Sequence, residues 1–132
     1  MQRAVHDALV EKVAAAARRI RIGDPMEQGT NIGPIATAPQ FRKIMDYIEA
    51  GRSEGATCVL GGGRYTGPGA RGEQMVEPTI FTNVRNSMRI AQEEIFGPVL
   101  AVIPFNTEEE AVTIANDIPF GLAAGIWTRD IV

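Results

Sequence analysis

Segments with helical periodicity alternate with short apolar segments along this chain, and this alternation restricts the possible folds more than any other feature. The first helical segment, residues 5–20, has apolar residues every three or four positions and should end before residues 23–25, a Gly-Asp-Pro turn. Further helices are expected after Thr37 and Thr107. The apolar strand candidates are residues 57–60, 75–84, 98–105 and 123–128. This order predicts an α/β fold with a largely parallel sheet flanked by helices.

The second and third helices each begin with the pattern of a capping box. The Thr37 hydroxyl should accept a hydrogen bond from the Gln40 backbone N–H while the Gln40 side chain returns to the cap, and Thr107 with Glu110 repeats the pattern. At the far end, residues 128–132 combine a capping Thr with an acid, as at the start of a helix, but no helix body follows. We therefore interpret residues 1–132 as a truncated domain.

The composition excludes several classes of protein. Of the 132 residues, 45% are hydrophobic and 22% are charged, and the formal net charge is −3, which is typical of a soluble globular protein and provides no basic surface for nucleic acid or an anionic membrane. Without a segment that could span a bilayer or act as a signal peptide, a cytoplasmic protein is expected. Cys58 and His6 are the single cysteine and histidine, so neither an intrachain disulfide nor a zinc site built from these residue types is possible.

Three isolated signals each have a functional and a purely structural explanation. Residues 67–72 match the Gly-x-Gly-x-x-Gly dinucleotide fingerprint, but no strand leads into them and no helix follows, so we interpret them as a solvated loop between strands. Cys58 could be a catalytic thiolate, yet it lies in an apolar strand, and we interpret it as a buried, inert thiol. His6, beside acidic residues on a helix, is interpreted as a surface residue rather than a ligand or general base.

Residues 93–99 place two acids, an aromatic residue and a Gly-Pro turn directly before an apolar strand. A carboxylate there can accept hydrogen bonds from both hydroxyls of a ribose, and an exposed phenyl ring can stack on a flat heteroaromatic ring. The alternative, which the residues by themselves favour, is a turn with solvated acids and with Phe96 in the core. Glu93 and Glu94 do not form a glycosidase pair, since successive side chains of an extended segment point apart.

The same segment resembles a known family. Residues 78–81 and 88–99, the latter including Glu-Glu-Ile-Phe-Gly-Pro, are similar to the signature of the aldehyde dehydrogenase superfamily. Further matches occur in the order of that family over essentially the whole chain: Gly23-Asp24-Pro25, Gly33-Pro34, Tyr47-Ile48, Glu54-Gly55-Ala56, Gly61-Gly62, Ala115-Asn116 and Phe120-Gly121-Leu122-Ala123-Ala124-Gly125.

This resemblance implies a function and two cofactor contacts. Members of the superfamily oxidise an aldehyde to a carboxylic acid with NAD or NADP, through a cysteine thiolate. By resemblance, Glu94 binds the hydroxyls of the nicotinamide ribose and Phe96 packs beside the nicotinamide. No catalytic residue and no metal ligand is assigned in this chain, because Cys58 does not match the family's nucleophile, which lies further upstream.

The resemblance also predicts what these 132 residues do by themselves. They correspond to part of the catalytic domain, in its C-terminal half, without the Rossmann-like cofactor domain, so we expect an inactive chain that binds no cofactor tightly. The alternative is a non-catalytic module that associates with itself through surfaces which other segments would cover. A homo-oligomer is expected, whereas the sequence selects neither a particular aldehyde nor NAD over NADP.

Overall fold

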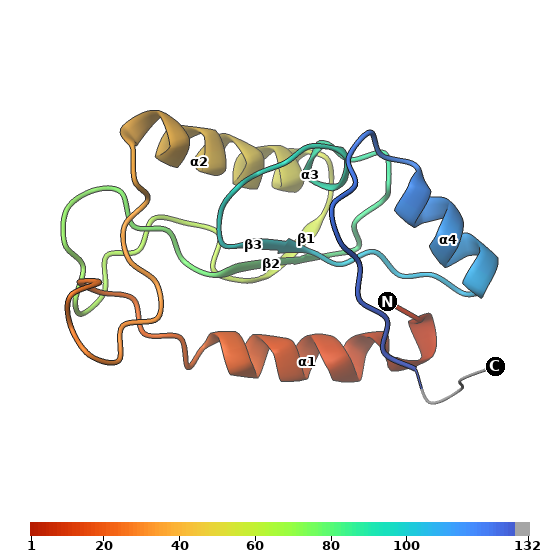
Figure 1. Cartoon of the computed structure of the whole chain (residues 1–132), viewed down its shortest axis with the longest axis horizontal. Coiled ribbons are helices and arrows are strands. Elements are labelled where there is room, and N and C mark those ends of the chain that lie inside the picture. The colour runs from red at the N-terminus through yellow and green to blue at the C-terminus, as the bar shows by residue number, and fades with distance from the viewer. Residues whose placement is uncertain (129–132) are drawn as a thin grey trace.

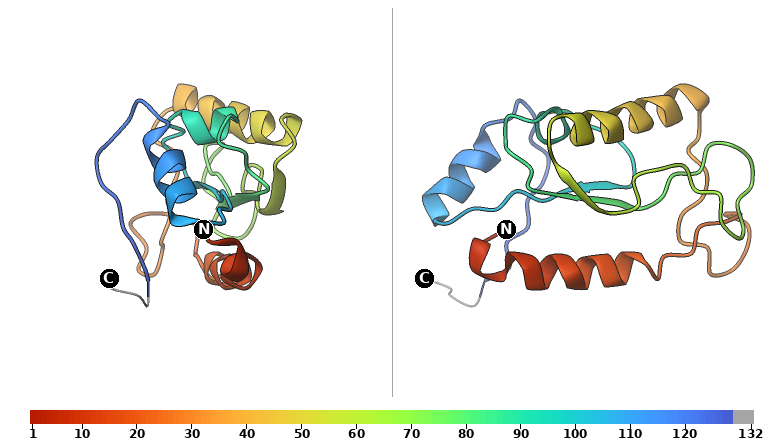
Figure 2. Two further views of the ribbon diagram at one scale, coloured as in Figure 1. Left: turned by 90° about the vertical axis from the view of Figure 1, so that its right-hand side faces the viewer. Right: turned by 180° about the vertical axis from the view of Figure 1, so that it is seen from behind.

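The computed structural model describes residues 1–128, so the helix start expected at 128–132 lies largely outside the described residues. A three-stranded sheet lies between α1 on one face and α2 with α3 on the other, and α4 packs beside one end (Figures 1 and 2). The elements in chain order are η1 (Arg3–Val5), α1 (His6–Ala17), α2 (Ala38–Ser53), β1 (Thr57–Leu60), β2 (Thr79–Thr82), α3 (Arg89–Gln92), β3 (Val99–Ala101) and α4 (Glu108–Asn116).

The α/β class is confirmed, but the sheet is mixed rather than largely parallel. Its order is β1-β2-β3, with β1 antiparallel to β2 and β2 parallel to β3. The connections explain the difference. Residues 61–78 form a loop that returns the chain directly beside β1, whereas the segment from β2 to β3 passes through α3 and reaches the sheet in the same direction again.

Apolar runs predicted longer strands than the structure contains. Met75 and Val76 are buried, yet the strand after them extends only from Thr79 to Thr82, because an isolated bridge between Arg64 and Val76 replaces a continuous ladder. The strand expected at residues 123–128 is also absent: this segment is exposed and irregular. A strand needs a place beside another strand of a sheet, and in the part of the chain that the structure describes the sheet consists of β1, β2 and β3.

The core is divided between the two faces of β2, which is buried along its whole length. Phe81 packs with Ile44 and Ile48 of α2, while Ile80, the next residue, packs with Ala14 of α1 on the opposite face. The buried hydroxyl of Thr79 accepts a hydrogen bond from Gly62 N at 2.9 Å and donates one to Glu77 O at 2.8 Å. Within residues 1–128, no helix is both long and apolar enough to cross a membrane.

Both predicted helix caps are present. In each capping box, however, the second bond, which should join the side chain of the later residue to the backbone of the cap, has a different partner from the one predicted. The Thr37 hydroxyl accepts from Gln40 N at 3.3 Å and the Thr107 hydroxyl from Glu110 N at 3.2 Å. The Glu110 carboxylate, however, accepts from the backbone of Asn106 at 2.7 Å, one residue before the cap. The Gln40 side chain does not bond to its own helix but donates to the backbone of Ile95 and Phe96.

Candidate functional site

The turn between α3 and β3 contains the acids and the aromatic residue that the sequence singles out. α3 ends at Gln92, and Glu93 is extended with φ −122° and ψ 153°. Ile95 enters the core, whereas Phe96 is 74% exposed and has a φ of 55°, a left-handed conformation that is strained for a bulky residue. The interpretation in which Phe96 fills the core is therefore wrong: Ile95 fills that space.

Gln40 holds the far end of this turn. Its side-chain Nε2 donates to Ile95 O at 2.9 Å and to Phe96 O at 3.1 Å. Both carbonyls precede β3 and lack a sheet partner, so the two amide hydrogens of one side chain satisfy both. The expected return of the Gln40 side chain to its own cap is wrong, because this side chain extends to the carbonyls of Ile95 and Phe96 instead.

Glu93 is held at the near end. The Tyr47 hydroxyl donates to Glu93 Oε2 at 2.7 Å, and Arg89 Nε donates to Glu93 Oε1 at 3.1 Å. The Arg89 guanidinium also lies over the Tyr47 ring, 4.5 Å from its centroid. The hydrogen bonds from Tyr47 and then from Arg89 lower the pKa of Glu93, while the hydrogen bond to Glu93, burial and the negative charge of Glu93 raise the pKa of Tyr47.

Glu94 differs from its neighbour in its surroundings. Its side chain is exposed, and none of residues 1–128 donates a hydrogen bond to it or pairs with it. It lines an open groove of about 760 Å³ between the end of α3 and the segment that follows α4. Phe96 is not part of the wall of this groove. The other lining residues are Ala91, Gln92, Glu93, Ala115, Asn116, Ile118, Phe120, Gly121, Leu122, Ala123 and Ala124.

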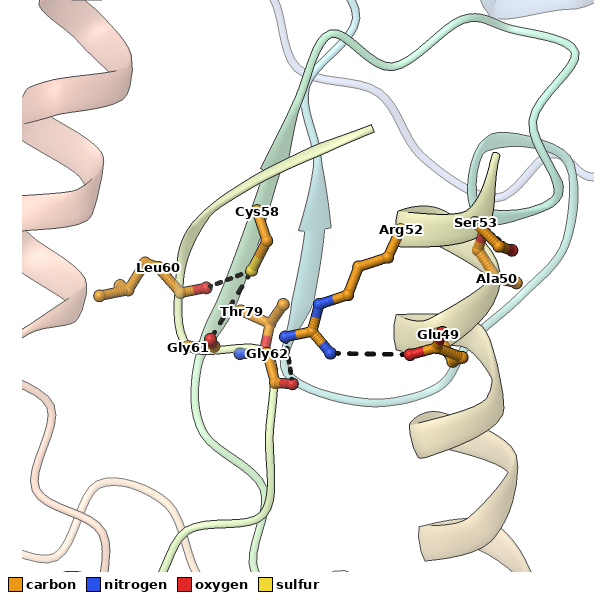
Figure 3. Close-up of polar contacts among 9 residues, drawn as sticks. All are labelled: Glu49, Ala50, Arg52, Ser53, Cys58, Leu60, Gly61, Gly62 and Thr79. Carbon is orange, nitrogen blue, oxygen red and sulfur yellow. Dashed lines mark hydrogen bonds and ion pairs between the residues drawn. The ribbon is translucent and has the colours of Figure 1, made fainter. Parts of the chain in front are cut away.

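Cys58 lies away from this groove, on β1. Its Sγ is 3.3 Å from Leu60 O, and the nearby Arg52 guanidinium reaches from α2 to donate to Gly62 O at 2.6 Å (Figure 3). The thiol is half-buried and packs against the core, so its predicted burial is only partial. Residues 67–72 form the expected exposed loop between strands. No cluster of three potential metal ligands occurs in the part of the chain that the structure describes.

His6 is not the surface residue that we expected. Its side chain is only 13% exposed, its Nδ1 lies 2.7 Å from Asp7 Oδ1, and its Nε2 is buried without a partner among the described residues. The acidic residues next to His6 in the sequence do not indicate whether distant segments of the chain bury its side chain. Here η1 folds the N-terminus back, with Arg3 N donating to Phe105 O at 2.8 Å, and so brings distant segments close to the start of α1.

Comparisons with known proteins agree on one family. The aldehyde dehydrogenase family matches residues 1–132. Betaine aldehyde dehydrogenase of Mesorhizobium japonicum is 44% identical over 131 residues, which are 99% of this chain and 27% of that protein. The enzyme of the same name from Brucella anthropi is 46% identical over 127 residues, covering 96% and 26%. The structure of betaine aldehyde dehydrogenase from Staphylococcus aureus in complex with NAD⁺ matches with a TM-score of 0.93 and 36% identity, over 98% of this chain and 26% of that one.

Proposed function

Since the chain belongs to the aldehyde dehydrogenase family, we propose that it carries the nicotinamide-ribose contact of an NAD(P)-dependent aldehyde dehydrogenase. In this proposal, Glu94 accepts hydrogen bonds from the ribose hydroxyls and Phe96 packs beside the nicotinamide. The chain spans about a quarter of the length of the relatives it matches. We propose that residues 1–132 are one part of the catalytic domain and contain none of the Rossmann-like cofactor domain.

The observation that carries this proposal is the contrast between the two adjacent acids. Tyr47 and Arg89 occupy the Glu93 carboxylate, whereas the Glu94 carboxylate faces solvent at a groove and has acceptor capacity for two hydroxyls. Phe96 adds an exposed aromatic face on a strained backbone, and strain of this kind is concentrated at functional sites. The carboxylate at the groove therefore fits the hydroxyls of a ribose, and Phe96, outside the wall of the groove, offers an aromatic face from the same turn.

When bound, the nicotinamide accepts the hydride that leaves the aldehyde substrate as the acid is formed. The part of this chain is to hold and orient the ribose. The thiol that the covalent step requires is not at this groove, because Cys58 lies on β1 with Arg52 and Gly62 around it. We therefore expect no aldehyde oxidation by these 132 residues by themselves.

Two measurements test this proposal. An NAD-reduction assay with betaine aldehyde, chosen from the names of the relatives, should show no turnover. Turnover that the substitution Cys58→Ser abolishes would contradict the expectation. Calorimetry with NAD should give a dissociation constant in or above the millimolar range, because one ribose contact and one aromatic face must offset the ordering of a flexible ligand. Micromolar affinity would mean that the cofactor site is larger than proposed.

A second candidate function is self-association, which the segment after α4 favours. Leu122, Ile126 and Trp127 are each at least 88% exposed, and Phe120 is 55% exposed. Apolar side chains gathered in one segment are typical of an interaction surface. We propose that this segment makes the chain a homo-oligomer.

A further inference from the structure

We propose that Glu93 is a positioning residue, whose carboxylate, held by Tyr47 and Arg89, fixes the backbone from which Glu94 extends at the groove. This inference rests on the proposed ribose contact of Glu94. It assigns a role to the first of the two acids, and it extends the site to a tyrosine and an arginine that sequence patterns do not single out.

The anchor of this arrangement is Tyr47. Its ring belongs to the hydrophobic core and is only 3% exposed, and it lies in the sixteen-residue helix α2. A hydroxyl on such a side chain has a fixed place. The 2.7 Å bond from it therefore holds Glu93, at the start of the turn between α3 and β3, in a fixed position relative to α2.

Arg89 completes a closed set of contacts. Its Nε reaches both carboxylate oxygens of Glu93, at 3.1 and 3.2 Å, and its guanidinium covers the Tyr47 ring. Each of the three side chains therefore contacts the other two. α3 has only four residues and no side-chain N-cap, so by itself it provides little to fix the chain that follows.

Fixing Glu93 also fixes the direction of Glu94. Because the backbone of Glu93 is extended, successive side chains project to opposite sides, and a Glu93 carboxylate tied to α2 leaves Glu94 directed away from that helix. Gln40, also on α2, holds the carbonyls of Ile95 and Phe96. One helix thus holds the turn on both sides of Glu94, which prepares its carboxylate for a ligand before binding.

The test uses Tyr47→Phe, which keeps the buried ring and loses only the hydroxyl. The matched control is Tyr65→Phe in an exposed loop, which also loses one hydrogen bond from a hydroxyl, the bond to Pro68 O. Two properties of the whole chain are measured: the ¹⁵N order parameter of the Glu94 amide, and the dissociation constant for nicotinamide mononucleotide by NMR titration. We expect Tyr47→Phe to lower the order parameter from about 0.85 to below about 0.6. We also expect it to weaken binding by about three- to tenfold, whereas Tyr65→Phe changes neither.

Glu93→Ala provides a second variant, because the 46% exposed side chain of Glu93 can be removed without opening the core. It should reproduce both effects. An unchanged order parameter in both variants, or unchanged affinity despite a mobile Glu94, would overturn the positioning role. Glu94→Gln separates the two proposals: if it binds nicotinamide mononucleotide as the wild type does, the proposed ribose contact fails, whereas the order parameter of the Glu94 amide in Tyr47→Phe and Glu93→Ala tests the positioning role without any ligand.

Discussion

Glu93 and Glu94 are adjacent in the chain but differ in every partner. Their contrast depends on Tyr47, which is 46 residues from Glu93 in the sequence. The bonds that hold the carbonyls of the same turn come from Gln40, which is 55 residues from Ile95. Local rules predict the hydroxyl caps of Thr37 and Thr107 correctly because both partners lie within one helical turn. No local rule predicts a bond between distant segments, and for that reason the role of Gln40 was predicted wrongly.

Acid should weaken the tie between Tyr47 and Glu93. The pKa of Glu93 is lowered in the folded chain, so its contribution to stability is complete above the ordinary glutamate pKa of about 4.3 and is lost as the pH falls through the lowered value. The difference in unfolding free energy between the wild type and Tyr47→Phe should therefore shrink below about pH 4.3. Denaturant titrations at a series of pH values measure it, and a difference that stays constant down to pH 2 would contradict the assignment.

Gln40→Met should destabilise the fold, because it removes the two donors to Ile95 O and Phe96 O and retains the backbone cap to Thr37. The expected loss of unfolding free energy is about 1–3 kcal/mol, the usual range for leaving a partly buried acceptor without a partner. Denaturant unfolding measures this loss. Gln28→Met, in an exposed loop, is the control and should change stability little. Equal unfolding free energies of the two variants would show that the hydrogen bonds of the Gln40 side chain contribute nothing to stability.

At the scale of elements, burial was easier to predict than pairing. Apolar runs identified the location of β2 and β3, but not their lengths or the antiparallel pairing of β1 with β2. The same pattern marked residues 123–128 as a strand, although the structure leaves them exposed. The spacing of apolar residues in the sequence indicates which side chains are buried. Strand pairing depends on which segment lies alongside, and the sequence pattern does not contain that information.

The loop between β1 and β2 offers a matched pair of glycines. Gly61 and Gly72 have φ values of 65° and 79°, so alanine is strained at either position. Only at Gly61 would the added Cβ clash with backbone, the carbonyl group of Pro78, while at Gly72 it meets nothing within 4 Å. Gly61→Ala should therefore lower the unfolding free energy by about 1–3 kcal/mol more than Gly72→Ala does. Equal losses in denaturant unfolding would show that the approach to Pro78 is not tight.

For the whole molecule, the exposed apolar segment predicts association. Leu122, Ile126 and Trp127 are almost fully accessible to water, and burying such area is favourable by about 25 cal/mol per Å² before the cost of association is subtracted. We expect a dimer or larger assembly at micromolar concentration by sedimentation. Leu122→Glu should shift it toward monomer, and Met26→Glu, at an equally exposed position in the loop before α2, should not. A wild-type monomer that binds no apolar dye would contradict this prediction.

An amide chemical-shift map of the labelled chain tests the proposal that Glu94 recognises a ribose. Nicotinamide mononucleotide should shift the amides of Glu94 and of the groove residues from Ala115 to Ala124, while free nicotinamide, which lacks the ribose hydroxyls, should leave Glu94 nearly unchanged. Glu94→Gln should remove the ribose-dependent shifts. Shifts that persist in Glu94→Gln, or that centre on residues 67–72, would show that Glu94 does not recognise the ribose.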